Sequence, residues 1–272
     1  MGLVNIAYAP RLTWANPTLE LLEEQALAPM FGDKPVELGL KGIENKFLGV
    51  LHQDPRYEKM FAAAFSEITG NRFTVENVTR AIAAFERTII SMRSPYDRYR
   101  WNGDSTAISD AAKRGEIVFS SSEKGGCFQC HGGWNFSSVR FAGADRGAME
   151  DRGGLFFNTG VSGYAPPNRG LAEHTGREND IGKFKAPTLR NIAVTAPYMH
   201  DGSIATLEDV IDHYVNGGRM AHANKSTIMR PLKLSEQDKS DLIEFVKSLT
   251  DEEMLRDPRW ADPWTKPKPR TR

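Results

Sequence analysis

The sequence predicts an all-α protein, in which helical units are joined by long loops rich in Gly and Pro. Apolar residues recur at helical spacing in several segments, and some of these segments begin with residues typical of helix N-termini. No segment shows the strict apolar–polar alternation of a half-buried strand. Helices are expected over residues 17–30, 55–65, 75–89, 110–119, 207–214 and 236–249.

The first half of the chain contains two segments with a continuous apolar face. In the first, Tyr57, Phe61, Ala64 and Phe65 fall at positions i, i+4, i+7 and i+8. Thr74 is a suitable N-cap for the second. The apolar face of this second helix is expected to hold Val78, Ala81, Ile82, Phe85 and Ile89.

In the second half, Ser109 is the expected cap of a short helix that ends near Phe119. Capping-box sequences at 206–209 (TLED) and 235–238 (SEQD) predict the starts of two later helices. The first of these has Leu207, Val210, Ile211 and Tyr214 on one face, and the second has Leu242, Phe245, Val246 and Leu249.

Residues 132–185 lack helical periodicity, and a loop of that length is usually functional or wraps around something large. The segment 257–272 is rich in Pro, Lys and Arg and is expected to be a tail.

The composition excludes some classes of partner. The chain has 272 residues, with 35 basic and 35 acidic side chains, so nothing favours nucleic acid binding. No apolar run approaches the length of a membrane span, which is about 20 residues. The first residues show neither the basic nor the apolar region of a signal peptide.

Both cysteines of the chain lie in one five-residue box, Cys127-Phe128-Gln129-Cys130-His131. The C-x-x-C-H spacing is typical of covalent attachment of a c-type haem. Two thiols at this spacing can each reach one vinyl group of a single porphyrin, and the following imidazole can bind the iron.

Three other interpretations of the box account for less of it. A structural zinc site usually has four ligands, and the chain has no second cysteine pair. A thioredoxin-like redox pair leaves His131 without a role. A disulfide between Cys127 and Cys130 would close only a very short loop and stabilise little.

Several segments together resemble the bacterial diheme cytochrome c peroxidase family, including its methylamine-utilisation (MauG-like) branch. The similarity extends from about residue 3 to 250, and the last of the matching segments is the most specific. These segments are 22–27 (LEEQAL), 35–39 (PVELG), 81–88 (AIAAFERT), 94–99 (SPYDRY), 127–133 (CFQCHGG) and 184–210 (FKAPTLRNIAVTAPYMHDGSIATLEDV).

The resemblance implies two cytochrome c-like helical domains with one haem each. An incomplete N-terminal peroxidase domain is expected over 1–104, a complete C-terminal cytochrome c domain over 105–256, and the tail over 257–272. The box at 127–131 then holds the haem that supplies electrons to a peroxidatic haem. In cytochrome c folds a small residue on the first helix lets an aromatic residue of the last helix cross closely, and Gly115 and Phe245 match these positions.

The first C-x-x-C-H of the family and the calcium-binding asparagine near it do not occur in this sequence. We therefore expect the sequence to begin part-way through the first domain, as a fragment or truncated product of a two-haem protein. Bacteria attach c-type haem outside the cytoplasmic membrane, so a periplasmic location is expected.

The resemblance also implies roles for three residues of the first half. Gln25 and Glu37 match positions that line the peroxidatic pocket, with Glu37 as the acid/base that aids O–O cleavage. Trp14 matches an aromatic residue between the two haems, where it would relay electrons. Outside the family, the ordinary expectation is a surface Gln, a solvated Glu and a core Trp.

The candidates for the iron ligand opposite His131 are Met199, Tyr214, Met220, Met229 and the remaining histidines. A general cytochrome c argument favours a downstream methionine, here Met199. The family register instead places Tyr214 at the ligand position, as in the MauG-like branch. A phenolate stabilises ferric iron, whereas a thioether favours ferrous iron. Thr195 and Pro197 match backbone ligands of the family's calcium site.

The function expected from the resemblance is peroxide-dependent oxidation. Hydrogen peroxide would be the oxidant, and a small electron-transfer protein or a protein substrate would supply electrons. The alternative is a single-haem cytochrome c that carries electrons without enzymatic activity.

Overall fold

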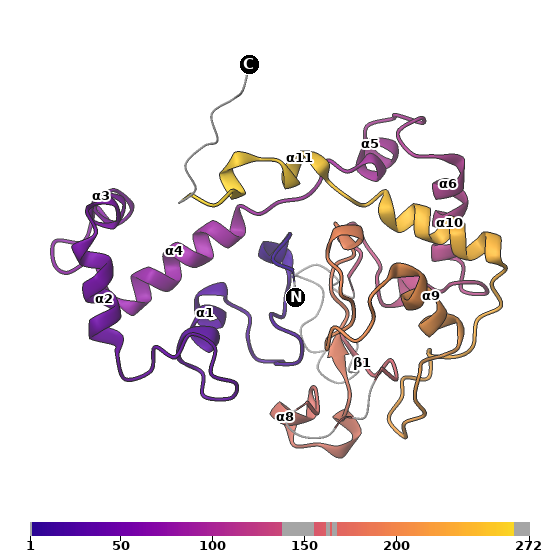
Figure 1. Cartoon of the computed structure of the whole chain (residues 1–272), viewed down its shortest axis with the longest axis horizontal. Helices are drawn as coiled ribbons and strands as arrows, with labels where there is room; N and C mark the ends of the chain where they lie inside the picture. The colour runs from indigo at the N-terminus through magenta and orange to yellow at the C-terminus, as the bar shows by residue number, and fades with distance from the viewer. Residues whose placement is uncertain (1, 138–154, 162–163, 165–167, 264–272) are drawn as a thin grey trace.

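The computed structural model describes residues 2–137, 155–161, 164 and 168–263. The described chain is mostly helical, so the all-α prediction is confirmed. Figure 1 shows the helices of the N-terminal half on one side and those of the C-terminal unit on the other, with the N-terminal segment between them. The two parts are joined by the connection from α4 (Val75–Arg87) to α5 (Pro95–Trp101), and α11 (Glu252–Leu255) runs beside this connection.

The N-terminal half consists of four helices and one short 3-10 helix. They are η1 (Ile6–Tyr8), α1 (Leu22–Phe31), α2 (Glu44–Gln53), α3 (Pro55–Ala64) and α4 (Val75–Arg87). Its main apolar cluster centres on Phe61, which stacks on Phe73 at a ring-centroid distance of 4.6 Å. Thr74 caps α4 as predicted, because its hydroxyl oxygen accepts a hydrogen bond from the main-chain N–H of Asn77 (3.2 Å).

The structure corrects three details of this half. The first helix begins at Leu22 rather than near residue 17, and α2 was not predicted. In α4, Val78 is buried, but Ile82 and Phe85 are 36% and 50% exposed. The buried side of α4 passes through Ala83, because contact with α1 and η1 covers only that stripe of the helix.

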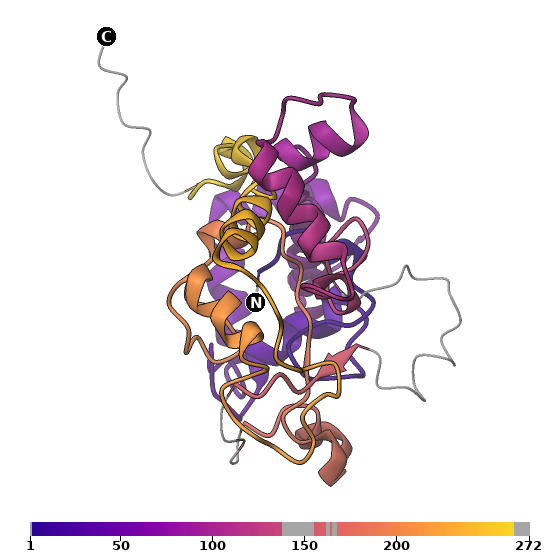
Figure 2. The same ribbon diagram turned by 90° about the vertical axis from the view of Figure 1, so that its right-hand side faces the viewer.

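The C-terminal unit is built around α6 and α10, with a two-stranded sheet at one end, visible in Figures 1 and 2. Its elements are α5 (Pro95–Trp101), α6 (Asp110–Ser120), η2 (Cys127–Gln129), β1 (Phe156–Phe157), α8 (Ala172–Thr175), η3 (Glu178–Asp180), β2 (Phe184–Lys185), η4 (Ile192–Val194), α9 (Leu207–Val215), α10 (Glu236–Lys247), α11 (Glu252–Leu255) and η5 (Pro258–Trp260).

The sheet and η5 lie in segments for which no regular structure was predicted. β1 and β2 pair antiparallel, with Phe156 opposite Lys185 and Phe157 opposite Phe184. Strands of two residues are too short to show a periodicity of two, so the sequence pattern could not reveal them. Part of the predicted loop (138–154) and the end of the predicted tail (264–272) lie outside the described residues.

The caps of the later helices form largely as predicted. Ser235 and Asp238 make a full capping box at α10. At α9, Thr206 accepts a hydrogen bond from the main-chain N–H of Asp209, and its hydroxyl donates to the Asp209 carboxylate (2.7 Å). The hydroxyl oxygen of Ser109 caps α6 by accepting from Ala112.

The largest apolar cluster gathers side chains from α5, α6, α9 and α10. Tyr96 of α5 packs edge-on against Phe245 of α10, so α5 belongs to this core although it precedes residue 105. Arg190 and Asp97 form a buried ion pair with two hydrogen bonds of 2.8 and 2.9 Å, which ties α5 to the segment before η4. None of the described helices is long and apolar enough to cross a membrane.

The crossing of α6 and α10 takes place at Gly115, as predicted. A Cβ on Gly115 would lie 1.9 Å from the carbonyl oxygen of Asp241 and 2.8 Å from the Cβ of Phe245. The backbones of the two helices can therefore approach this closely only when residue 115 is glycine.

Gly115→Ala is expected to lower the free energy of unfolding by about 1–3 kcal/mol, since the added methyl group forces α6 and α10 apart. Urea denaturation of the haem-loaded protein measures this. Gly49→Ala is the control, because a Cβ on Gly49 of α2 meets no atom within 4 Å. It is expected to be neutral or stabilising by roughly 0.5–1 kcal/mol. Equal stability of the two variants would contradict the role of the crossing.

Candidate haem site

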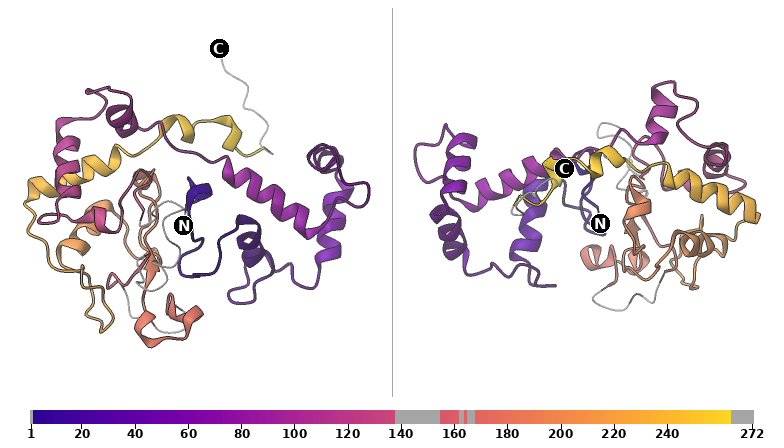
Figure 3. Two further views of the ribbon diagram at one scale, coloured as in Figure 1. Left: turned by 180° about the vertical axis from the view of Figure 1, so that it is seen from behind. Right: turned by 45° about the horizontal axis from the view of Figure 1, so that its top comes forward.

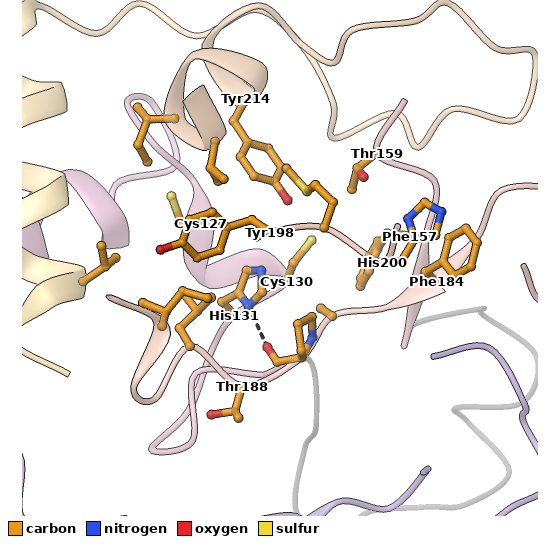
Figure 4. Close-up of a pocket in the computed structure, with 18 of the residues that line it drawn as sticks. Cys127, Cys130, His131, Phe157, Thr159, Phe184, Thr188, Tyr198, His200 and Tyr214 are labelled. Atoms are coloured by element: carbon orange, nitrogen blue, oxygen red, sulfur yellow. Dashed lines mark hydrogen bonds between the residues drawn. The ribbon is translucent and has the colours of Figure 1, made fainter. Parts of the chain in front are cut away.

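The local fold of the C-x-x-C-H box turns its three functional side chains toward one cavity, as Figure 4 shows. The 3-10 turn η2 begins after Gly126, which has a left-handed backbone (φ 61°). The carbonyl oxygen of Cys127 accepts hydrogen bonds from the main-chain N–H groups of Cys130 (3.2 Å) and His131 (2.9 Å). Gly125 is required before the turn, because a Cβ there would lie 2.7 Å from the carbonyl oxygen of Val118.

Hydrogen bonds determine which nitrogen of His131 is available to a metal. Nδ1 lies 3.1 Å from the carbonyl oxygens of both Phe136 and Pro187. Carbonyl oxygens only accept, so Nδ1 carries the hydrogen and donates. The neutral ring then has its lone pair on Nε2, and burial favours this neutral form by lowering the pKa of His131.

The cavity has a volume of about 540 Å³ and mostly apolar walls. It is bounded by Cys127, Cys130 and His131 on one side and by Tyr214 on the other (Figure 4). A flat apolar cofactor with a metal at its centre fits these walls, two thiols and one free imidazole nitrogen. The other apolar and aromatic lining residues include Phe119, Phe157, Phe184, Leu189, Ile192, Leu207, Val210, Ile211, Leu242 and Val246.

Both cysteines are free thiols that face the cavity. Burial raises the pKa of Cys127 to about 12, and burial together with the neighbouring Cys127 raises that of Cys130 to about 12. The thiols are therefore protonated at neutral pH. The described residues contain no group of three or more His, Cys, Asp or Glu side chains placed to hold a metal ion.

The structure brings both predicted axial ligands to the cavity. Tyr214 projects from α9 across the cavity from His131 (Figure 4). Burial, and secondarily the nearby Cys130 and Cys127, raises the pKa of its phenol. Met199 also lines the cavity, in an unfavourable left-handed backbone conformation (φ 71°).

The three residues predicted from the first half are not brought together. Trp14 lines the same cavity, and its carbonyl oxygen accepts a hydrogen bond from the main-chain N–H of Lys185 (2.8 Å). Gln25, on α1, and Glu37, in the exposed loop after α1, do not line it. Two apolar neighbours of Glu37, Val36 and Leu38, are 64% and 62% exposed.

The predicted calcium ligands lie at the rim of the cavity. Thr195 and Pro197 line it and are exposed. The Thr195 hydroxyl donates to the carbonyl oxygen of Ile192 (3.1 Å). Calcium at this place stays a prediction.

Sequence reasoning missed an aromatic wall and a buried lysine. His200 stacks on Phe184 with ring centroids 3.6 Å apart, at the end of the cavity where Figure 4 places both. Lys185 is only 4% exposed. No sequence signal identifies it, because lysines are almost always at the surface.

The helical fold, the C-x-x-C-H turn and the cavity together define a protein of the haem c-binding class. Comparison with known proteins identifies the family within this class. The family described as "Di-haem cytochrome c peroxidase" matches residues 1–106. The "Cytochrome-c peroxidase IdrP1" of Pseudomonas sp. (strain SCT) is 34% identical over 272 residues, which covers 93% of this chain and 68% of that protein.

Two further relatives agree with this. The "Methylamine utilization protein MauG" of Methylorubrum extorquens is 32% identical over 249 residues, covering 91% of this chain and 63% of that protein. The crystal structure of "a MauG-like protein associated with microbial copper homeostasis" has a TM-score of 0.88 and 37% identity, over 97% of this chain and 78% of that one. The chain therefore belongs to the di-haem cytochrome c peroxidase and MauG family of peroxidase-type oxidoreductases.

Burial of the thiols has a measurable consequence in the folded, haem-free chain. The raised pKa lowers the thiolate fraction at pH 8 by about a thousandfold relative to an ordinary cysteine, and the thiolate is the nucleophile. Iodoacetamide at pH 8 is expected to alkylate the folded chain at least about 100-fold more slowly than the same chain in urea. Equal rates, with retained helicity by circular dichroism, would contradict the raised pKa values of Cys127 and Cys130.

Proposed function

We propose that this chain acts in peroxide-dependent oxidation, with a c-type haem attached at Cys127 and Cys130. The observation that carries the proposal is the free Nε2 of His131, which faces an apolar cavity between two thiols. When bound, the haem supplies the one-electron chemistry that links an electron donor to peroxide.

The chain's own residues would fix this cofactor in three ways. The thiols of Cys127 and Cys130 anchor it covalently, and each retains its proton until attachment because of burial. His131 binds the iron through Nε2, while Nδ1 stays bonded to two carbonyl oxygens. The apolar walls exclude water, which strengthens electrostatic interactions inside the cavity.

Tyr214 would bind the iron together with His131, and Met199 is the alternative to Tyr214. Tyr214 lies across the cavity from His131, and the apolar surroundings that raise its pKa would be compensated by bonding to ferric iron. Such a ligand suits a site that is used in its oxidised states.

Electrons would leave the site through Trp14. Trp14 lines the cavity, and a hydrogen bond from the main-chain N–H of Lys185 fixes the main chain of Trp14 against β2. Beyond Trp14 the proposal places the peroxidatic haem of the family. Gln25 and Glu37 would line that second site, with Glu37 as the acid/base that protonates the leaving oxygen of hydrogen peroxide.

The relatives' names support this proposal and suggest its wider setting. One is named a cytochrome-c peroxidase, and another a methylamine utilisation protein. The donor is accordingly a small electron-transfer protein or a protein substrate, in the periplasm. The chain spans 63% to 78% of the lengths of the three reported relatives. The peroxidase activity of a whole family member is therefore proposed here for this chain. Calcium at Thr195 and Pro197 belongs to the proposal as well.

A second candidate function is a single-haem electron carrier without enzymatic activity. The cavity that carries the C-x-x-C-H box would suffice for this function. The DNA sequence upstream of the codon for residue 1 distinguishes the two candidate functions. Peroxide-dependent oxidation by two haems requires an in-frame C-x-x-C-H there, and a stop codon without such a box would exclude it.

In the haem-loaded gene product, Glu37→Gln is expected to lower kcat/KM for hydrogen peroxide by at least about 100-fold, because the amide cannot transfer the proton. Stopped-flow absorbance measures reoxidation of the reduced protein. Glu24→Gln, which removes an exposed carboxylate of α1, is the matched control and should leave the rate unchanged. Equal rates for both variants would remove Glu37 from the mechanism, and no reoxidation of the unmodified protein would favour the carrier.

The axial ligand is tested by Tyr214→Phe and Met199→Leu, each of which keeps the volume of the side chain close to that of the original. Loss of the phenol oxygen is expected to change the optical and electron paramagnetic resonance spectra of the ferric protein, and Met199→Leu should leave them unchanged. A spectral change in Met199→Leu alone would assign the methionine instead.

A further inference from the structure

Lys185 is a buried cation that has no counter-ion among the described residues. It lies in β2, and its side chain is buried, with only 4% of the residue exposed. Within the described part of the chain it forms no ion pair and no side-chain hydrogen bond. Burial lowers its pKa to about 8, and no nearby charge contributes to that shift. The amine therefore remains largely protonated at pH 7 in an environment that penalises its charge.

The other positively charged side chains around the cavity either have a carboxylate partner or are exposed to solvent. Arg190 is paired with Asp97 and also donates to the carbonyl oxygen of Trp134. Arg230 is exposed and donates to the carbonyl oxygen of Ser122. Among the described lysines and arginines that line the cavity, Lys185 is the one that is both buried and unpaired.

A nearby lysine, Lys183, has an ordinary environment and can be compared with Lys185. Lys183 donates to the Asp180 carboxylate at 3.0 Å, and its side chain is 25% exposed. Lys185, two residues later, lies between the large cavity and a smaller one formed with the N-terminal segment. A charged lysine side chain at this buried position costs folding free energy unless an anion pairs with its ammonium group.

We propose that Lys185 is the counter-ion of a haem propionate at the end of the cavity next to Trp14. The inference rests on the proposed function, because it requires a haem at the C-x-x-C-H box. A haem carries two propionate carboxylates, and the cavity offers them one unpaired buried ammonium group. Pairing satisfies both charges in a site from which water is largely removed.

The ion pair would also shift the equilibrium between the ferric and ferrous states of the haem. A positive charge held near the porphyrin stabilises the ferrous state relative to the ferric state, because reduction adds a negative charge. Lys185 also shares a main-chain hydrogen bond with Trp14. The charge therefore lies where the proposed electron relay meets the haem.

The experiment compares three variants of the haem-loaded protein by spectroelectrochemical titration. Lys185→Met removes the charge and keeps much of the apolar side chain, and Lys185→Arg keeps the charge. Lys183→Met removes the nearby lysine that already has a partner. Lys185→Met is expected to raise the ferric-to-ferrous ratio at a fixed potential about tenfold, equivalent to about 59 mV for one electron.

The expected pattern is a shift in Lys185→Met, a near-normal ratio in Lys185→Arg and no change in Lys183→Met. Resonance Raman spectra provide a second readout, in which the propionate bending mode should move only in Lys185→Met. An unchanged ratio and an unchanged mode in a protein with covalent haem would overturn the inference. Absence of covalent haem in the unmodified protein would instead refute the proposed function, so the two failures are distinguishable.

Discussion

The haem site depends on the pairing of two loops, residues 131–137 after the C-x-x-C-H box and residues 186–190 after β2. Nδ1 of His131 donates to one carbonyl oxygen from each loop. Further bonds join Ser137 to Ala186, Asn135 to Thr188, and Phe136 to Leu189. Because these bonds hold the backbone on both sides of the imidazole, they fix its tautomer and direct Nε2 into the cavity.

The two paired loops are in turn stabilised by contacts with the buried core of the C-terminal unit. Arg190, at the end of the second loop, bonds to both Asp97 of α5 and the carbonyl oxygen of Trp134. Gly115 lets α6 and α10 cross closely, and α6 leads directly into the box. Precise placement of the His131 imidazole therefore rests on tertiary contacts between parts of the chain that are far apart in sequence.

The N-terminal segment completes the other end of the site. Figure 3 shows from two further directions that this segment lies between the two groups of helices. Trp14 reaches the cavity from it and bonds to β2, so a residue of the peroxidase-like half becomes part of the wall of the haem site. Gln25 and Glu37 do not line this cavity, and Val36 and Leu38, next to Glu37, leave apolar surface exposed. Trp14 is therefore a point of contact between the N-terminal segment and the cavity of the C-terminal unit.

The sequence by itself determined the helical class, the caps at Thr74 and Ser235 and the glycine crossing, because these depend on local chemistry and spacing. It also predicted the haem-binding roles of Cys127, Cys130 and His131 from their spacing. It could not determine that Ile82 and Phe85 face solvent, since helical periodicity defines a face but not its partner. Only the tertiary structure showed the tautomer of His131 and the burial of Lys185. Both are consequences of which loops meet across the cavity, and such long-range contacts leave no periodic signal in a single sequence.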